Sequence, residues 1–289
     1  MRKIGFHVSI SGSIANSVDH AEKLGCNAFQ IFSRNPRGWK FKPLEKAESE
    51  KFVNKLRGSK IDPYSVVVHM PYLPNLSSPT GDTYMKSIDA LLGEIIRCNM
   101  LKIPFLVIHL GSHLGKGRDN GIDQIVNSYM YVSENLIKQG QKNNVKILLE
   151  NSAGQKNSVG SRFSELRTIL DKIGSQDVGV CLDTCHMFAA GYDLRTEESV
   201  IKTFDEFDDQ VGLNNLFVIH LNDSKGDLNS NLDRHDHIGK GKIGNVGMSS
   251  ILNEKRLTHL PIILETPIDN NGDNIENLEA VRNLIRENI

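Results

Sequence analysis

Histidine and acidic residues close six consecutive apolar segments of this 289-residue chain. The segments and their closing residues are VVVHMPYL at His69, LVIHLGSH at His109, KILLEN at Glu150, VGVCLDTCH at Asp183, LFVIHLND at His220 and PIILET at Glu265. Three further candidates are His186, just after Asp183, and the pair Asp233 and His235 in NLDRHDH. Lysine and arginine do not follow this pattern, and buried carboxylates and imidazoles are costly unless they are paired or bind metal. We therefore interpret all of these residues as metal ligands.

The size and chemistry of this ligand set indicate more than one ion. A four-coordinate zinc ion takes about four ligands, so the set predicts two or three ions. Imidazole and carboxylate without thiolate suit zinc, and also manganese or iron. Two ions about 3.5–4 Å apart stabilise the attacking and leaving oxygens of phosphoryl transfer, and a metal-bound water with a pKa near about 7 supplies the nucleophile. The pattern therefore favours metal-dependent hydrolysis of a phosphodiester.

Four further residues are of types that can bind or orient a metal ion. His7 closes the first apolar run and His113 lies in LGSH, so we expect both to orient ligands through a ring N–H or to lie on the rim. His237 competes with His235 as a ligand. Cys185, within DTCH, is expected to be a buried thiol rather than a thiolate ligand.

The residues that position these ligands lie in eight apolar runs, which alternate with helical stretches. The expected strands are Lys3–His7, Ala28–Ile31, Ser65–His69, Phe105–His109, Lys146–Glu150, Val178–Leu182, Leu216–His220 and Pro261–Glu265. The expected helices run from a cap at Ser13 to Leu24, from Pro43 to about Leu56, and over Asp82–Met100, Ile122–Gln139, Phe163–Ile173, Glu197–Asp209 and Ile275–Arg286; the connection from Asn222 to about Val246 is expected to be mostly loop. Near-continuous apolar runs are typical of parallel strands buried on both faces.

This alternation predicts an α/β fold, a single (β/α)8 TIM barrel over residues 1–289. The carboxyl ends of barrel strands form one face, where the active sites of such barrels lie. Ligands about 200 residues apart in the sequence are therefore expected to meet there.

Composition limits the class of protein. Hydrophobic residues make up 39% and charged residues 24%, as in a soluble globular protein. The chain has no apolar run of about 18 residues and no apolar h-region after MRKIGFHVS, so we expect a cytoplasmic protein. Its four cysteines form no CxxC pair and are expected to be reduced. A net charge of −1 argues against nucleic-acid binding unless bound divalent cations supply positive charge.

Longer motifs stand in a fixed order along the chain. The most specific is GVCLDTCHMFAAGYDLRT, Gly179–Thr196, and it is accompanied by LGSH, LLENSAG, HLNDSK and DRH followed by GKGKIG. From IGFHVS to ILET the sequence resembles the endonuclease IV family of abasic-site endonucleases. All of the family's metal ligands have a counterpart here, while Met70 and Pro74 in HMPYLPNL are variations.

The resemblance implies a trinuclear zinc centre, with manganese or iron as substitutes. By motif, Glu150 bridges two ions, His69 and His109 complete the first, Asp183, His220 and Glu265 the second, and His186, Asp233 and His235 hold the third. The catalytic carboxylates would then be Glu150, Asp183 and Glu265.

The resemblance also implies a substrate and a reaction. Family members bend duplex DNA and flip out the abasic nucleotide, and the matching residues here are Arg37 in SRNPRGW and Tyr72 and Leu73 in MPYL. Lys240 and Lys242 either contact phosphates or are solvated. The implied monomeric enzyme hydrolyses the phosphodiester 5′ to the abasic site, leaving a 3′-hydroxyl and a 5′-deoxyribose phosphate.

Two alternatives remain at this point. A metal-dependent sugar isomerase on the same barrel would need two ions and no DNA wedge, which the third ligand set and Tyr72-Leu73 disfavour. A non-catalytic sensor of damaged DNA would be marked by loss of a bridging carboxylate, and Glu150 is present.

Overall fold

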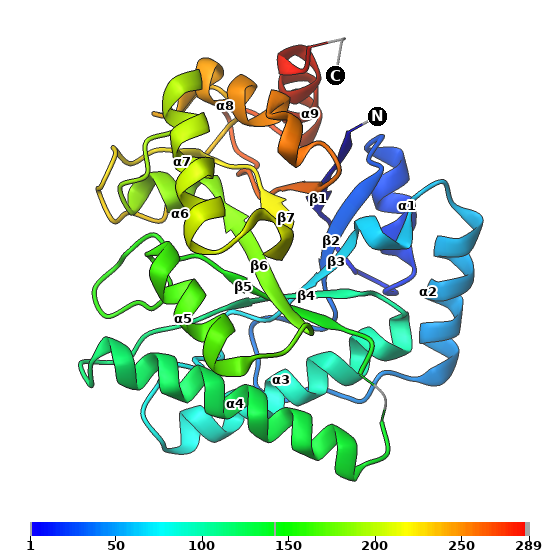
Figure 1. Cartoon of the computed structure of the whole chain (residues 1–289). Helices are drawn as coiled ribbons and strands as arrows, with labels where there is room; N and C mark the ends of the chain where they lie inside the picture. Colours follow the sequence, from blue (N-terminus) through cyan, green and yellow to red (C-terminus); the bar gives the residue numbers. More distant parts are fainter. Residues whose placement is uncertain (1, 142, 287–289) are drawn as a thin grey trace.

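The structure, a computed structural model, describes residues 2–141 and 143–286. Among these residues, eight parallel strands close into a barrel in the order β1-β10-β7-β6-β5-β4-β3-β2 (Figure 1). The barrel strands are β1 (Lys3–His7), β2 (Ala28–Phe32), β3 (Val66–His69), β4 (Phe105–His109), β5 (Lys146–Glu150), β6 (Val178–Asp183), β7 (Leu216–His220) and β10 (Pro261–Leu264). The expected TIM barrel is confirmed, and each strand lies within one residue of its predicted bounds.

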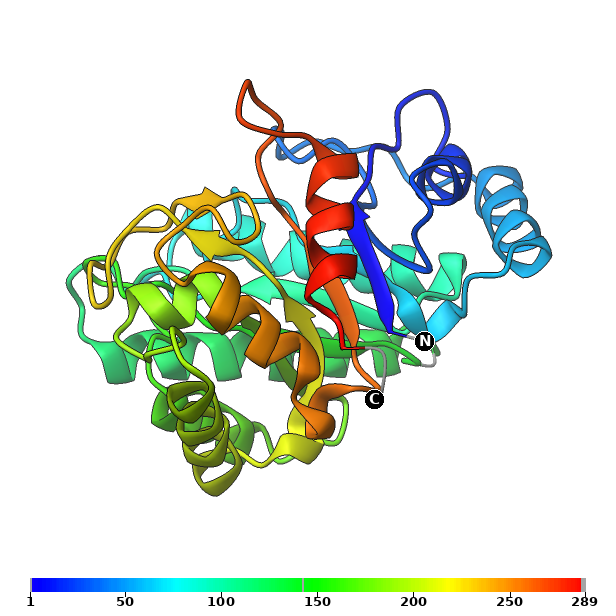
Figure 2. The same ribbon diagram turned by 90° about the horizontal axis from the view of Figure 1, so that it is seen from above.

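Helices surround the barrel. They are α1 (Asn16–Lys23), α2 (Lys46–Gly58), α3 (Asp82–Leu101), α4 (Arg118–Lys138), α5 (Phe163–Ile173), α6 (Thr184–Ala189), α7 (Glu197–Gln210), α8 (Gly244–Asn253) and α9 (Asn274–Leu284), with short 3-10 turns at Pro63–Ser65, Leu213–Asn215 and Lys255–Leu257. In the view of Figure 2, α9 (red) lies beside β1 (blue) and in front of β10 (orange), the first and last strands, which pair with each other. Its Leu278 and Val281 are buried in the hydrophobic core. None of the helices in the described ranges is long and apolar enough to cross a membrane.

Three predicted helix starts are wrong, and one of them is that of α4, which begins at Arg118 rather than at the expected Ile122. Ser13 does not cap α1, which begins after Ala15, because the Ser13 hydroxyl donates instead to Glu48 Oε1 at 2.6 Å. The helix predicted from Pro43 begins only at Lys46. The residues before it are held in an irregular path by hydrogen bonds to α3, including one to the carbonyl of Lys42.

The loop expected between Asn222 and Val246 carries two features that its sequence did not suggest. Two short antiparallel strands, β8 (Asp223–Ser224) and β9 (His235–Asp236), pair there. Helix α8 then begins at Gly244. The β8–β9 pair fixes the segment that bears Asp233 and His235 beside the barrel mouth.

The core has two layers because strand side chains alternate in direction. Between the strands and the helices lies the larger apolar layer, which includes Val66, Val68 and Leu106. Inside the barrel lies a smaller cluster of Ala28, Val67, Phe105, Val107, Leu148, Cys181, Val218 and Ile263. On each strand that carries a candidate ligand, the ligand comes two positions after the last residue of this inner cluster, as His69 does after Val67. Both side chains therefore point to the inside of the barrel. The metal-ligand candidates therefore sit on an apolar floor at the carboxyl ends of the strands.

Candidate metal centre

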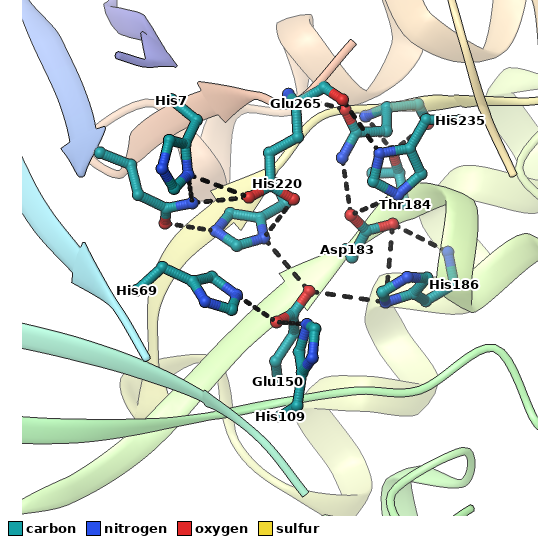
Figure 3. A network of polar contacts seen from close by, with 12 residues as sticks. His7, His69, His109, Glu150, Asp183, Thr184, His186, His220, His235 and Glu265 are labelled. Atoms are coloured by element: carbon teal, nitrogen blue, oxygen red, sulfur yellow. Dashed lines mark hydrogen bonds and ion pairs between the residues drawn. The ribbon is translucent and has the colours of Figure 1, made fainter. Parts of the chain in front are cut away.

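The nine candidate ligands meet at one end of the barrel. Figure 3 shows His69, His109 and His220 arranged around Glu150. His69 Nε2 and His109 Nε2 each lie 3.1 Å from Glu150 Oε2, and His220 Nδ1 lies 3.2 Å from Glu150 Oε1. Because Glu150 and these histidines come from four different strands, the closed barrel alone brings them together.

The remaining candidates continue this network. His220 Nδ1 lies 3.4 Å from Glu265 Oε2. His186 Nε2 lies 3.2 Å from Asp233 Oδ1, and His235 Nε2 lies 3.6 Å from both Asp233 Oδ1 and Asp183 Oδ2. All nine residues thus form one continuous polar cluster.

Ligand atoms within this cluster fall into three groups, and within each group they lie within 4.8 Å of one another. The groups are His69, His109 and Glu150; Glu150, Asp183, His220 and Glu265; and Asp183, His186 and His235. Glu150 belongs to the first two groups. Asp183 joins the second and third, a second shared carboxylate that the sequence did not suggest. Asp233 joins the third group through its contact with His186.

Each of four histidines directs one ring nitrogen to a protein acceptor and the other into the cluster. The Nδ1 atoms of His69, His186 and His235 lie against backbone carbonyls of Met70, Asn151 and Glu265, at 2.6, 2.9 and 3.1 Å. His220 is reversed, since its Nε2 donates to the side-chain oxygen Oε1 of Gln30 at 2.9 Å. Such contacts fix the tautomer and the ring orientation of metal-binding histidines. The arrangement leaves one nitrogen of each ring free to ligate.

A short helix positions Asp183 and His186. Asp183 caps α6, and its Oδ1 accepts the His186 N–H at 2.8 Å. Its Oδ2 accepts from the Asn222 amide at 2.6 Å. The three-residue spacing of Asp183 and His186 is therefore the first turn of α6, a helix that the sequence pattern did not predict.

Gln30 is a positioning residue that the sequence analysis missed. It is fully buried on β2, and its amide nitrogen donates to Glu265 Oε1 at 2.6 Å and to His7 Nδ1 at 3.1 Å. Together with its bond to His220, the side chain orients two ligands at once. The available signal was a glutamine at an inward position of the apolar run AFQIF.

The structure gives positions for the four further residues whose roles the sequence left open. His7 contacts Gln30 and lies 3.7 Å from Glu265 Oε1, beside the cluster. His113 lies away from it, and its Nδ1 accepts backbone N–H groups of the turn that follows. His237 does not compete with His235, because its ring nitrogens contact Asp269 at 3.0 Å and Asn277 at 2.9 Å. Burial raises the pKa of Cys185 to about 12, so it is a protonated thiol.

Electrostatics in the cluster favour a cation. Burial acts to raise the pKa of Glu150, but His109 and His220 outweigh it and hold that pKa well below its usual value. Burial also opposes a charge on His186, yet Asp183 and Asp233 raise its pKa to about 10. Against the same effect of burial, the neighbouring carboxylates raise the pKa of His109 and His220 as well, whereas burial lowers that of His69. Protons on the first two and on His186 therefore balance the buried carboxylates, and a bound cation would take over that role and release them.

One buried atom supports metal binding directly. Among the described residues, His235 Nε2 is buried and has no hydrogen-bond partner, although two carboxylates lie 3.6 Å away. A buried polar atom without a partner is costly, and a metal ion between these groups would satisfy all of them. The donor set is imidazole nitrogen and carboxylate oxygen, which suits zinc, manganese or iron. The residues present fit such ions.

Three exposed residues lie on the loops that follow β2 and β3 at the carboxyl ends of these strands. Tyr72 is 60% exposed, and its ring centroid lies 5.8 Å from that of His109. Leu73 is 40% exposed and Arg37 is also exposed. Lys240 and Lys242 are exposed as well, but the first donates to the Asn271 carbonyl and the second lies 3.8 Å from Asp227.

Comparison with known proteins finds relatives over almost the whole chain. A family model described as "Xylose isomerase-like TIM barrel" matches residues 18–287. A "Probable endonuclease 4" of Cenarchaeum symbiosum is 52% identical over 283 residues, which cover 98% of this chain and 99% of the relative. The crystal structure of endonuclease IV from Thermus thermophilus matches with a TM-score of 0.85 at 34% identity, covering 98% of both chains.

A more distant likeness shows the fold alone. The structure of a D-tagatose 3-epimerase-like protein matches with a TM-score of 0.73 at 16% identity, covering 98% of this chain and 97% of that chain. The barrel is thus shared with sugar epimerases, whereas the high identity over full length is shared with the endonucleases. The chain belongs to the endonuclease IV family of metal-dependent nucleases.

Proposed function

We propose that this protein is a zinc-dependent endonuclease of base excision repair that cuts duplex DNA at abasic sites. It hydrolyses the phosphodiester 5′ to the abasic nucleotide and leaves a 3′-hydroxyl and a 5′-deoxyribose phosphate. Residues 1–289 act as one barrel domain, in a cytoplasmic monomer. The observation that supports this most strongly is the set of three ligand groups linked by shared carboxylates at the barrel mouth.

Three zinc ions are proposed to occupy this set. His69, His109 and Glu150 would hold the first, Glu150, Asp183, His220 and Glu265 the second, and Asp183, His186, Asp233 and His235 the third. When bound, the ions would supply an activated water and stabilise charge on the phosphate oxygens. Manganese or iron are the natural substitutes.

The carboxylates of the chain keep the ions close to one another. Glu150 and Asp183 each belong to two groups, so both would be shared between ions. Glu265 is fixed by Gln30 on one side and lies near His220 on the other. The apolar floor of the barrel excludes bulk water from below, which strengthens electrostatic interactions at the mouth.

DNA is proposed to contact the exposed residues around the mouth. Tyr72 and Leu73 lie in the loop that directly follows His69, and the Tyr72 ring lies near the His69 ring. A wedge that these residues insert into the duplex would therefore lie next to the metal centre. Arg37 would enter from the loop after β2. Apolar wedges open base steps, and an abasic nucleotide costs least to flip because its pairing is already lost.

A sugar isomerase is the alternative that shares the barrel. The third ligand group, with Asp183, His186 and His235, goes beyond the two ions such an enzyme would need. The identity of 52% with a "Probable endonuclease 4" also supports the nuclease.

The test is incubation of purified protein with a duplex that carries one abasic site, with and without chelator. We expect a single incision at the 5′ side of the site, a 3′ end that a DNA polymerase extends, and loss of activity on chelation. An intact duplex of the same sequence is the control. Incision of both duplexes at equal rates, or activity that survives complete removal of metal, would contradict the proposal.

A further inference from the structure

A second cluster of buried charges lies away from the metal centre, on the outer helix α3. Glu94 is fully buried there, and Arg34 and Arg97 are 6% and 7% exposed. Arg34 Nε donates to Glu94 Oε1 at 2.5 Å, and the Ser33 hydroxyl donates to Glu94 Oε2 at 2.6 Å. Buried charges are expensive, and replacing them by apolar residues is often neutral or stabilising. A contribution to the stability of the fold is therefore not a sufficient reason for these buried charges.

Every partner of this cluster lies in one loop, residues 33–42, which follows β2 and carries Arg37; we call it the Arg37 loop. Arg97 Nε donates to the Ser33 hydroxyl at 2.7 Å and its guanidinium also donates to the Ser33 carbonyl. Arg97 Nη1 donates to the Lys42 carbonyl at 3.2 Å. One arginine of α3 thus holds both ends of the loop.

The middle of the Arg37 loop is held by Arg34. Its Nη1 donates to the carbonyl of Gly38 at 3.1 Å, and its guanidinium carbon lies 4.1 Å from the ring centroid of Phe41. The Phe41 ring in turn lies against Gly93 of α3, where an added Cβ would come within 2.6 Å of Phe41 Cζ. The loop is therefore seated on one face of α3, formed by Gly93, Glu94 and Arg97.

Arg37 itself takes no part in this network. Its backbone N–H donates a hydrogen bond to Asn35 Oδ1 at 3.0 Å. Its exposed side chain forms no hydrogen bond with another described residue. A rigid base thus supports a loop whose central arginine is free to contact a ligand. Ordering such a loop before binding reduces the entropy lost on binding.

We propose that Glu94 is a positioning residue for DNA recognition, which acts through Arg34 and Arg97 to hold the loop so that Arg37 is presented to the duplex. This inference rests on the proposed function, because it assumes that Arg37 contacts abasic DNA. Glu94 touches neither DNA nor metal; it sets the shape of the surface that does.

The test uses the metal-loaded protein and compares Glu94→Gln, Gly93→Ala and Arg37→Ala. Glu94→Gln keeps the shape of the side chain but removes its charge, and Gly93→Ala displaces Phe41 without touching any charge. Asp89→Asn, at an exposed carboxylate of the same helix, is the matched control. The measurements are KM and kcat on an abasic duplex, metal content, and hydrolysis of bis(p-nitrophenyl) phosphate, a small diester that reports on the metal centre alone.

We expect Glu94→Gln and Gly93→Ala each to raise KM for the abasic duplex by about tenfold, a size typical of coupled neighbours. Metal content and hydrolysis of the small diester should stay at the level of Asp89→Asn. The double variant Glu94→Gln/Arg37→Ala should be little worse than Arg37→Ala, because both changes remove the same contact.

The outcomes separate the two proposals. If Arg37→Ala leaves KM unchanged, the proposed contact between Arg37 and DNA is wrong. If the wild-type protein does not cut abasic DNA, the proposed activity is wrong. If Arg37→Ala raises KM while Glu94→Gln and Gly93→Ala do not, the positioning role is overturned. Independent, multiplying effects in the double variant would overturn it as well. Gly93→Ala keeps the test decisive if Glu94→Gln does not fold.

Discussion

At the scale of single residues, Glu150 is the centre of the account. It contacts three histidines from three other strands and belongs to two ligand groups. Removing its charge would therefore disturb two ions and the nucleophile between them, whereas removing a terminal ligand would disturb one.

Glu150→Gln should lower the rate of incision of abasic DNA by several orders of magnitude and should also reduce metal content. Glu134→Gln, an exposed carboxylate on α4, is the control and should behave like the wild-type protein. The measurement is single-turnover incision together with elemental analysis. Near-normal incision by Glu150→Gln would show that the shared role is wrong.

Gln30 allows a subtler prediction. Gln30→Leu keeps a similar volume but leaves the His220 N–H and Glu265 Oε1 without their partner, in a position closed to solvent. Loss of such a partner typically weakens metal binding by about 10–100-fold. Competition for zinc with a chelator of known affinity measures this effect. Unchanged zinc affinity in a folded variant would mean that Gln30 does not orient the two ligands.

At the scale of elements, the strand ends carry the proposed ligands and the loops carry the proposed recognition residues. Every second residue of a strand points into the barrel. On β3 and β4, the candidate ligands His69 and His109 therefore lie above the apolar residues Val67 and Val107. The loop after β3 then directs Tyr72 and Leu73 to the surface beside the cluster.

Replacing Tyr72 and Leu73 together by alanine should reduce discrimination between abasic and intact duplexes without changing metal content. Truncation removes the proposed wedge but none of the proposed ligands. Tyr64→Ala is the matched control, because Tyr64 is 66% exposed but lies before β3, at the opposite end of the strand. Binding titrations on both duplexes measure the effect, and unchanged discrimination in the double variant would exclude the wedge.

Sequence patterns predicted the strands well because most are short apolar runs, and six of them end in or beside a candidate ligand. They failed at α6, whose six residues are all buried and show no polar face. They also failed at Gln30 and Glu94, because the contacts of a single polar residue in a buried strand or a long helix cannot be predicted from the sequence around it. Those partners, such as Ser33 and Glu265, lie far away in sequence and become visible only when the barrel closes.

At the scale of the whole molecule, the difficulty is how a chain of net charge −1 binds DNA. The nine proposed ligands include four carboxylates, Glu150, Asp183, Asp233 and Glu265. Three divalent ions would turn this negative mouth into one of about two positive charges, with neutral histidines. Metal and DNA binding should therefore be coupled.

Protein stripped of metal should bind abasic duplex much more weakly than metal-loaded protein. The salt dependence of the loaded form should be moderate, because few lysine or arginine contacts are available to release counterions. Titrations of both forms at several salt concentrations measure this. Equal affinity of the two forms would refute the coupling.

The most direct test of the central claim is a zinc titration of metal-free protein, followed by the rate of incision of a duplex with one abasic site. We predict that incision rises with added zinc and reaches its maximum at about three equivalents per chain, the number of ligand groups at the barrel mouth. Full activity at one equivalent, or activity that does not respond to zinc, manganese or iron, would contradict the account.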